Sequence, residues 1–129
     1  MENYPVLEDR SMSELLGPVA AVALIAQLNP DLPAPRIEFA PIHQDNGEYG
    51  AGVRLLMYQP EDGVYERWAH LIGSSNPDSH TDPAPTPRGN LCRRTYGSYA
   101  DVPVEVVAYV TPPAANHGAV LAATSGADR

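Results

Sequence analysis

The sequence predicts an α+β domain with the element order αββαββ, in which a four-stranded, mostly antiparallel sheet carries two helices on one face. Three observations predict it. Two segments have the apolar pattern of helices, each is followed by two strand-like runs, and the 14 prolines and 10 glycines concentrate in the connections. A chain of 129 residues with 43% hydrophobic residues fits one domain with a sizeable core.

The first helix lies in "PVAAVALIAQL", Pro18 to Leu28, and Asn29-Pro30 ends it because proline disfavours the helical conformation of its predecessor. This segment has almost no polar residue. A helix that is apolar on all sides is usually buried on all sides. One side therefore meets the sheet, and the other needs a cover, either a second copy of the chain or the C-terminal tail. We expect a homodimer.

The first pair of strands follows directly. "RIEFAPIH", residues 36–43, has the composition of a strand, and Pro41 marks it as an edge strand or interrupts it. Asn46-Gly47 is the strongest turn dipeptide in the chain. "AGVRLLMYQ", residues 51–59, alternates in side-chain direction as the second strand.

The second helix lies in "PEDGVYERWAHLIG", residues 60–73, where one stripe is apolar and Gly73 is the C-cap. That stripe contains Val64, Trp68, Leu71 and Ile72. Residues 91–99 and 102–110 are the last two strands, joined tightly around Asp101. The predicted organisation is a flexible segment at 1–12, one domain at 13–112 with a proline-rich loop at 74–89, and a flexible tail at 113–129.

Charge and composition exclude several classes of function. The formal net charge is −8, and all eight bases are arginines, so the acidic chain is expected to bind neither nucleic acid nor an anionic membrane. The most apolar run has 11 residues, whereas a span needs about 20. The first residues lack the basic region of a signal peptide, so we expect a cytoplasmic protein. Cys92 is the only cysteine, which excludes an internal disulfide and indicates an inert, partly buried thiol.

Two His-x-Asp pairs are the candidates for chemistry: His43 with Asp45, and His80 with Asp82. Imidazole and carboxylate two residues apart can bind one metal ion, and two such pairs would complete a four-ligand site of the zinc type. The same histidines suggest a small hydrolase. The chain has no glycine-flanked serine elbow and no phosphate-binding loop motif, so we expect no catalytic residues and no cofactor.

Arginine and tyrosine gather in the last two strands, and these residue types are enriched at interface hot spots. Alternation places Arg93 and Arg94 on opposite faces of their strand. Glu105 lies on a mixed face, where we expect a solvated side chain paired across strands. The predicted contact residues are Arg93, Arg94, Tyr96, Tyr99, Glu105 and Tyr109.

The sequence "WAHLIG" followed by "TYGSYADVPVEVVAYV" resembles small uncharacterised proteins of high-GC actinobacteria and their phages or mobile elements. In those proteins a Trp-Ala-x-x-Leu-Gly helix precedes a Gly-x-Tyr/Trp-x-Gly-Val-Pro-Val-Glu-Val strand pair. The similarity covers residues 64–110. Asp101 stands where glycine is usual, and the long proline-rich loop is a second departure. The resemblance implies the fold and no particular activity.

The sequence therefore predicts a small, non-catalytic protein-interaction module, of phage or mobile-element origin, that binds another protein or itself. One alternative is a small hydrolase or metal-dependent enzyme that uses the His-x-Asp loops. Another is an acidic mimic of DNA, although the acids are spread along the chain with no run longer than two.

Overall fold

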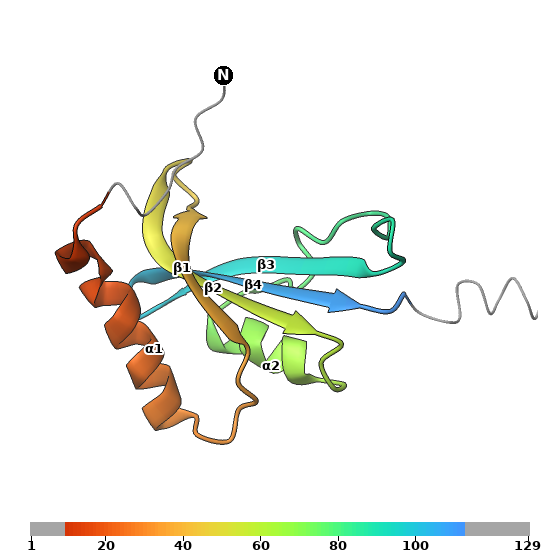
Figure 1. The fold of residues 1–129 in the computed structure, drawn as a ribbon, viewed down its shortest axis with the longest axis horizontal. Helices are drawn as coiled ribbons and strands as arrows, with labels where there is room; N and C mark the ends of the chain where they lie inside the picture. Colours follow the sequence, from red (N-terminus) through yellow and green to blue (C-terminus); the bar gives the residue numbers. More distant parts are fainter. Residues whose placement is uncertain (1–9, 113–129) are drawn as a thin grey trace, which may run out of the picture.

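The computed structural model describes residues 10–112 and confirms the α+β fold (Figure 1). The predicted flexible segments at 1–12 and 113–129 lie outside the described residues, except for residues 10–12, which lead into a 3-10 turn. The elements in chain order are η2 (Met12–Leu15), α1 (Leu16–Leu28), β1 (Arg36–His43), β2 (Tyr49–Tyr58), α2 (Val64–Leu71), β3 (Leu91–Tyr99) and β4 (Val102–Val110).

The four strands form one sheet in the order β1-β2-β4-β3. The two sequence-predicted hairpins, β1 with β2 and β3 with β4, are antiparallel. They meet through β2 and β4, which are parallel and aligned so that Val53 lies beside Val104. The sheet is therefore mixed, with a parallel pair at its centre and antiparallel pairs at both sides.

Both helices pack on the same face of the sheet, as predicted (Figure 1). This helix-bearing face receives every second side chain of the two central strands, since successive side chains point to opposite faces. The buried core consists of Ala21, Ile25, Val53, Leu55, Met57, Val64, Tyr65, Trp68, Ile72, Val102, Val104, Val106 and Ala108. Among residues 10–112, the opposite face of the sheet carries no helix, and we call it the open face.

Helix α1 buries only one of its sides. Pro18, Ala21 and Ile25 are buried, whereas Leu16 and Leu24 are exposed. The prediction that one side of this helix meets the sheet is confirmed, and the predicted cover for the other side, a second copy or the C-terminal tail, lies outside the described residues. Within the described residues, no helix is both long and apolar enough to cross a membrane.

Helix α2 is shorter than its sequence pattern. It begins at Val64, after Gly63 with a φ of 87°, so Glu61 and Asp62 precede it. It buries Trp68 against the sheet, and the indole N–H donates a hydrogen bond to the carbonyl oxygen of Pro33 at 3.2 Å. Its predicted apolar stripe is confirmed.

Strand β3 is the edge strand on which the end of α2 and the proline-rich loop converge. Ser98 N–H donates to the carbonyl oxygen of Ile72, and a Cβ at Gly97 would overlap that carbonyl. Farther along β3, the loop donates backbone hydrogen bonds from His80 to Arg94 and from Asp82 to Cys92. These hydrogen bonds fix the loop in place, and the loop covers the outer edge of β3.

The β3–β4 turn has an unusual composition for its geometry. Ala100 and Asp101 have φ angles of 50° and 65°, which is the left-handed pair of a type I′ turn. Asn and Gly are favoured in such turns because most side chains strain this conformation. The two strands nevertheless begin and end at the residues that the sequence predicts.

Candidate functional site

A row of alternating charges crosses the open face. It contains Glu38 from β1, Arg54 from β2, Glu105 from β4 and Arg94 from β3. Arg54 Nε donates to Glu105 Oε1 at 2.7 Å, and Arg54 Nη1 lies 3.4 Å from Glu38 Oε1. Arg94 Nη1 lies 3.5 Å from the other oxygen of Glu105. We call these four side chains the ionic row.

Glu105 is the centre of this row and is buried, with only 3% of its surface exposed. The expectation of a solvated Glu105 is wrong. Its cross-strand neighbours are Arg54 and Tyr96, whose long side chains flank it on both sides. Two guanidinium groups compensate the charge that burial would otherwise disfavour.

The two arginines of the row differ in how completely they are satisfied. Burial opposes the charge of Arg54, but hydrogen bonds and attraction from Glu105 and Glu38 outweigh it and raise its pKa. Arg94 Nη2 contacts the sulfur of Cys92 at 3.4 Å, and its buried Nε has no hydrogen-bond partner among residues 10–112. Cys92 itself is fully buried, whereas the sequence predicted a partly buried thiol.

Tyrosines surround the ionic row. Tyr96 and Tyr109, both predicted, are partly buried on the open face, and burial is the main cause that raises the pKa of each phenol. Tyr58 lies beside Tyr109 with ring centroids 5.4 Å apart and is 66% exposed. Tyr58 was not among the residues predicted from the sequence. Alternation along β2 puts it on the same face as Arg54, but only the β2–β4 pairing brings it to Tyr109.

The other two predicted contact residues, Arg93 and Tyr99, lie on the helix-bearing face. Arg93 pairs with Asp78 at 2.8 Å and with Glu66 at 2.9 Å, and its guanidinium lies 4.2 Å from the ring centre of Tyr65. Tyr99 packs against the core. Arg93 is therefore committed to internal contacts, and the open face holds four of the six predicted residues.

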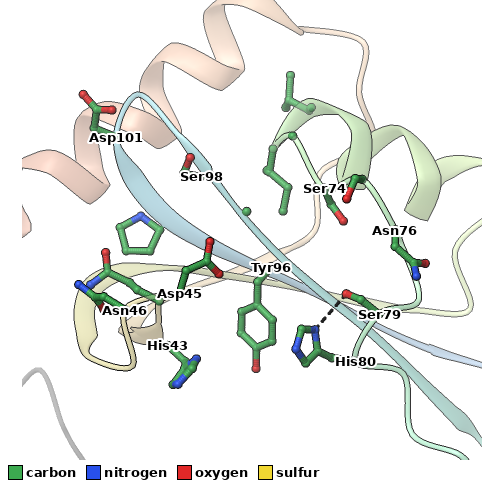
Figure 2. A pocket seen from close by; sticks show the side chains of 17 residues that line it. His43, Asp45, Asn46, Ser74, Asn76, Ser79, His80, Tyr96, Ser98 and Asp101 are labelled. Carbon is green, nitrogen blue, oxygen red and sulfur yellow. Dashed lines mark hydrogen bonds between the residues drawn. The ribbon is translucent and has the colours of Figure 1, made fainter.

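A polar depression of about 810 Å³ lies beside Tyr96. The tip of the β1–β2 hairpin supplies His43 and Asp45, and the proline-rich loop supplies His80. Figure 2 shows Tyr96 between the two imidazole rings. The rings of His80 and Tyr96 meet edge to face with centroids 4.8 Å apart.

The depression thus collects three of the four predicted metal-ligating residues. Asp82 is not part of its lining, and its backbone N–H is bonded to Cys92 on the β3 edge. Within residues 10–112, no three His, Cys, Asp or Glu side chains lie close enough to hold one metal ion. Ser79 Oγ lies 3.0 Å from Nδ1 of His80, but both residues are exposed. The lining offers hydrogen-bond donors and acceptors suited to a polar group.

Comparison with known proteins identifies no relative of this chain. No protein-family model matches the chain. No curated protein and no solved structure matches it significantly.

Proposed function

We propose that this chain is a non-catalytic protein-interaction module that binds a partner protein on its open face. The observation that supports this most is the exposed Tyr58, whose ring lies tilted against that of Tyr109 beside the ionic row. Tyrosine combines a large apolar ring with a hydroxyl group and has few rotatable bonds, so it binds with little loss of conformational entropy.

The ionic row makes the open face a preorganised surface. Arg54 and Arg94 are both bound to Glu105, so their positions are fixed before a partner arrives. A side chain that is already ordered loses less freedom on binding, which improves affinity. Because opposite charges alternate, the row presents no strong net field and leaves selection to shape and to the tyrosines.

The open face has nearly the dimensions of a standard interface. Four strands spaced about 4.8 Å apart and up to 10 residues long give a surface of at most about 19 by 33 Å, or roughly 600 Å², since β2 and β4 overlap only over Val53–Tyr58. A standard-size interface buries about 800 Å² on each partner. The polar depression beside Tyr96 extends the same surface and can supply the remainder.

The proposal is tested by cross-linking and quantitative affinity purification of the tagged full chain in the organism that encodes it. The wild type is compared with a Tyr58→Ser/Tyr109→Ser double variant and with Arg67→Ser, an exposed α2 control. A specific partner should be lost in the double variant and kept in the control. With the partner in hand, Tyr58→Ser should weaken binding by about 30-fold, as expected for a hot spot of ~2 kcal/mol. Equal recovery by all three proteins would contradict the proposal.

A small hydrolase or metal-dependent enzyme is the second candidate, because His43, Asp45 and His80 share one depression. Calorimetric titration of the full chain with zinc tests it. Stoichiometric binding that is lost in both His43→Ala and His80→Ala would favour the enzyme. We expect no stoichiometric zinc binding, and therefore no effect of either substitution.

We also propose that the protein works as a homodimer in the cytoplasm. The resemblance to small proteins of actinobacterial phages and mobile elements supports such a setting, where accessory proteins act by binding other proteins. The uncharged helix α1 supports the homodimer.

A further inference from the structure

The sheet has two edges, and the described residues cover only one of them. Along β3, the proline-rich loop occupies the outer side through the backbone hydrogen bonds of His80 and Asp82. Along β1, Ile37 is 42% exposed and Phe39 40%, and no residue among 10–112 pairs with the outer side of the strand. An exposed edge strand is a template for another strand, and proteins usually cover or blunt it. The open edge of β1 therefore has the character of a contact surface.

The hydrogen-bond pattern shows which backbone groups of β1 point outward. In an antiparallel pair, residues alternate between those bonded to the neighbouring strand and those directed away from it. Gln44 N–H donates to the carbonyl oxygen of Glu48 at 2.9 Å, which continues the β1–β2 register and assigns the even-numbered residues to the inner ladder. Pro41 agrees with this, because a proline has no N–H to give and is tolerated where the position faces away from the sheet. The outward N–H donors are those of Ile37, Phe39 and His43.

The ionic row also ends at this edge. Its charges alternate from Arg94 through Glu105 and Arg54 to Glu38, which lies on β1. A strand added beside β1 would place one side chain next to Glu38 on the open face. Arg36 contacts Glu38 at 3.3 Å, but its side chain is 77% exposed, and such a surface pair contributes little stability. A lysine or arginine on the added strand would continue the alternation of charge.

We propose that β1 binds an extended segment of a partner protein, which adds to the sheet as a further strand antiparallel to β1. The segment carries a lysine or arginine opposite Glu38 and apolar side chains opposite Ile37 and Phe39, on the helix-bearing face. In strand addition, backbone hydrogen bonds supply the affinity and alternate side chains supply the selectivity. This contact surface goes beyond the open face of the proposed function and does not need its tyrosines.

A strand from another protein fits this edge better than a second copy of β1 does. A copy whose Arg36 opposes Glu38 brings Pro35 into the new ladder. A copy centred on Phe39 brings in Pro41. Either proline removes an N–H donor from that ladder, and a copy centred on Glu38 would place two carboxylates side by side. A segment without proline can use every outward donor and acceptor of β1.

Amide hydrogen exchange of the full chain, measured by NMR, tests whether the edge is open. The amide of Ala40 should exchange at least about 100-fold more slowly than those of Ile37 and Phe39, because only Ala40 lies in the inner ladder with β2. Equal protection of all three amides in the free chain would overturn the proposal. The edge would then already be occupied, by a second copy or by residues 1–9 or 113–129.

A random dodecapeptide library displayed on phage and selected on the full chain supplies the probe. The enriched peptides should alternate apolar and polar residues around a lysine or arginine. Bound as synthetic peptides, they should protect the amides of Ile37 and Phe39 from exchange. N-methylation should weaken their binding at least about tenfold at every second peptide residue only, since alternate N–H groups face β1.

Variants separate the edge from the open face. Ile37→Pro removes one outward donor and keeps the inner ladder, so it should weaken peptide binding at least about tenfold. Glu38→Lys should shift the selected peptides toward aspartate or glutamate. The Tyr58→Ser/Tyr109→Ser double variant should bind the peptides as the wild type does, so failure of the edge and failure of the open face are distinguishable.

Three results would overturn the proposal. The first is a library that yields no peptide able to protect Ile37 and Phe39. The second is an N-methylation scan without the period of two residues, which decides the matter even where Ile37→Pro fails to fold. The third is unchanged peptide binding in a folded Ile37→Pro chain.

Discussion

Replacing Glu105 with glutamine removes the central charge of the ionic row and keeps its volume. Arg54 then retains Glu38 as a partner, whereas Arg94 loses its only ion pair among the described residues. Breaking a fully buried ion pair costs about 3–5 kcal/mol, while exposed pairs contribute about 0–1 kcal/mol. Glu105 is buried, but both arginine side chains are about a third exposed.

Water reaches the two guanidinium groups, so the stability lost in Glu105→Gln should lie between the values for a buried and an exposed ion pair. We expect the free energy of unfolding to fall by about 2 kcal/mol, equivalent to a decrease in Tm of about 5–10 °C for a domain of this size. Urea unfolding followed by Trp68 fluorescence measures it, because Trp68 is the only tryptophan and is buried.

A double-mutant cycle of Glu105→Gln with Arg54→Gln should give a coupling energy of about 1 kcal/mol or more. Glu38→Gln is the matched control, since Glu38 contacts Arg54 from a more exposed position, and it should cost no more than about 0.5 kcal/mol. If the free energy of unfolding of Glu105→Gln lies within about 0.5 kcal/mol of the wild-type value, the ionic row does not stabilise the fold.

Three further predictions concern other parts of the chain. Trp68→Ala should cost about 3–5 kcal/mol by leaving a cavity under α2, and an unchanged thermal melt would contradict the position of that helix. Replacing Ala100-Asp101 with Asn-Gly should raise the free energy of unfolding by up to about 1 kcal/mol, because both residues have positive φ; a lower Tm would refute the strain argument. Hydrogen bonds from Arg93 lower the pKa of Asp78, so its contribution is complete above the unfolded value of about 3.9 and is lost as the pH falls below it. In Asp78→Asn the free energy of unfolding should therefore fall less steeply at acid pH than in the wild type. An unchanged dependence on pH would show that the Asp78–Arg93 pair does not contribute to stability.

The alternation of residue types along the sequence predicted where the strands begin and end, but not which strands of the two hairpins lie side by side. The bounds of β3 and β4 follow from alternation and a short turn between them, so they were visible in the sequence. The burial of Glu105 was not visible, because it depends on Arg54, which is 51 residues away in the chain. Alternation shows which face a side chain lies on and says nothing about which strand lies beside it.

The same limit applies to the depression and to α1. His43 and His80 share one depression because a hairpin tip and a loop converge on β3, and their spacing in the sequence contains no sign of it. The composition of α1 predicted surplus apolar surface correctly. It also predicted that one side of the helix meets the sheet, and Ala21 and Ile25 lie on that side.

The central parallel pairing of β2 with β4 has a consequence for how the chain tolerates being cut. The proline-rich loop at 74–89 separates two halves, each of which contributes one hairpin and one of the two central strands. Cleavage in that loop breaks no strand, and the halves remain joined by the β2–β4 ladder and by the packing of α2 against β3 and β4. The two fragments should therefore reassemble when they are expressed separately.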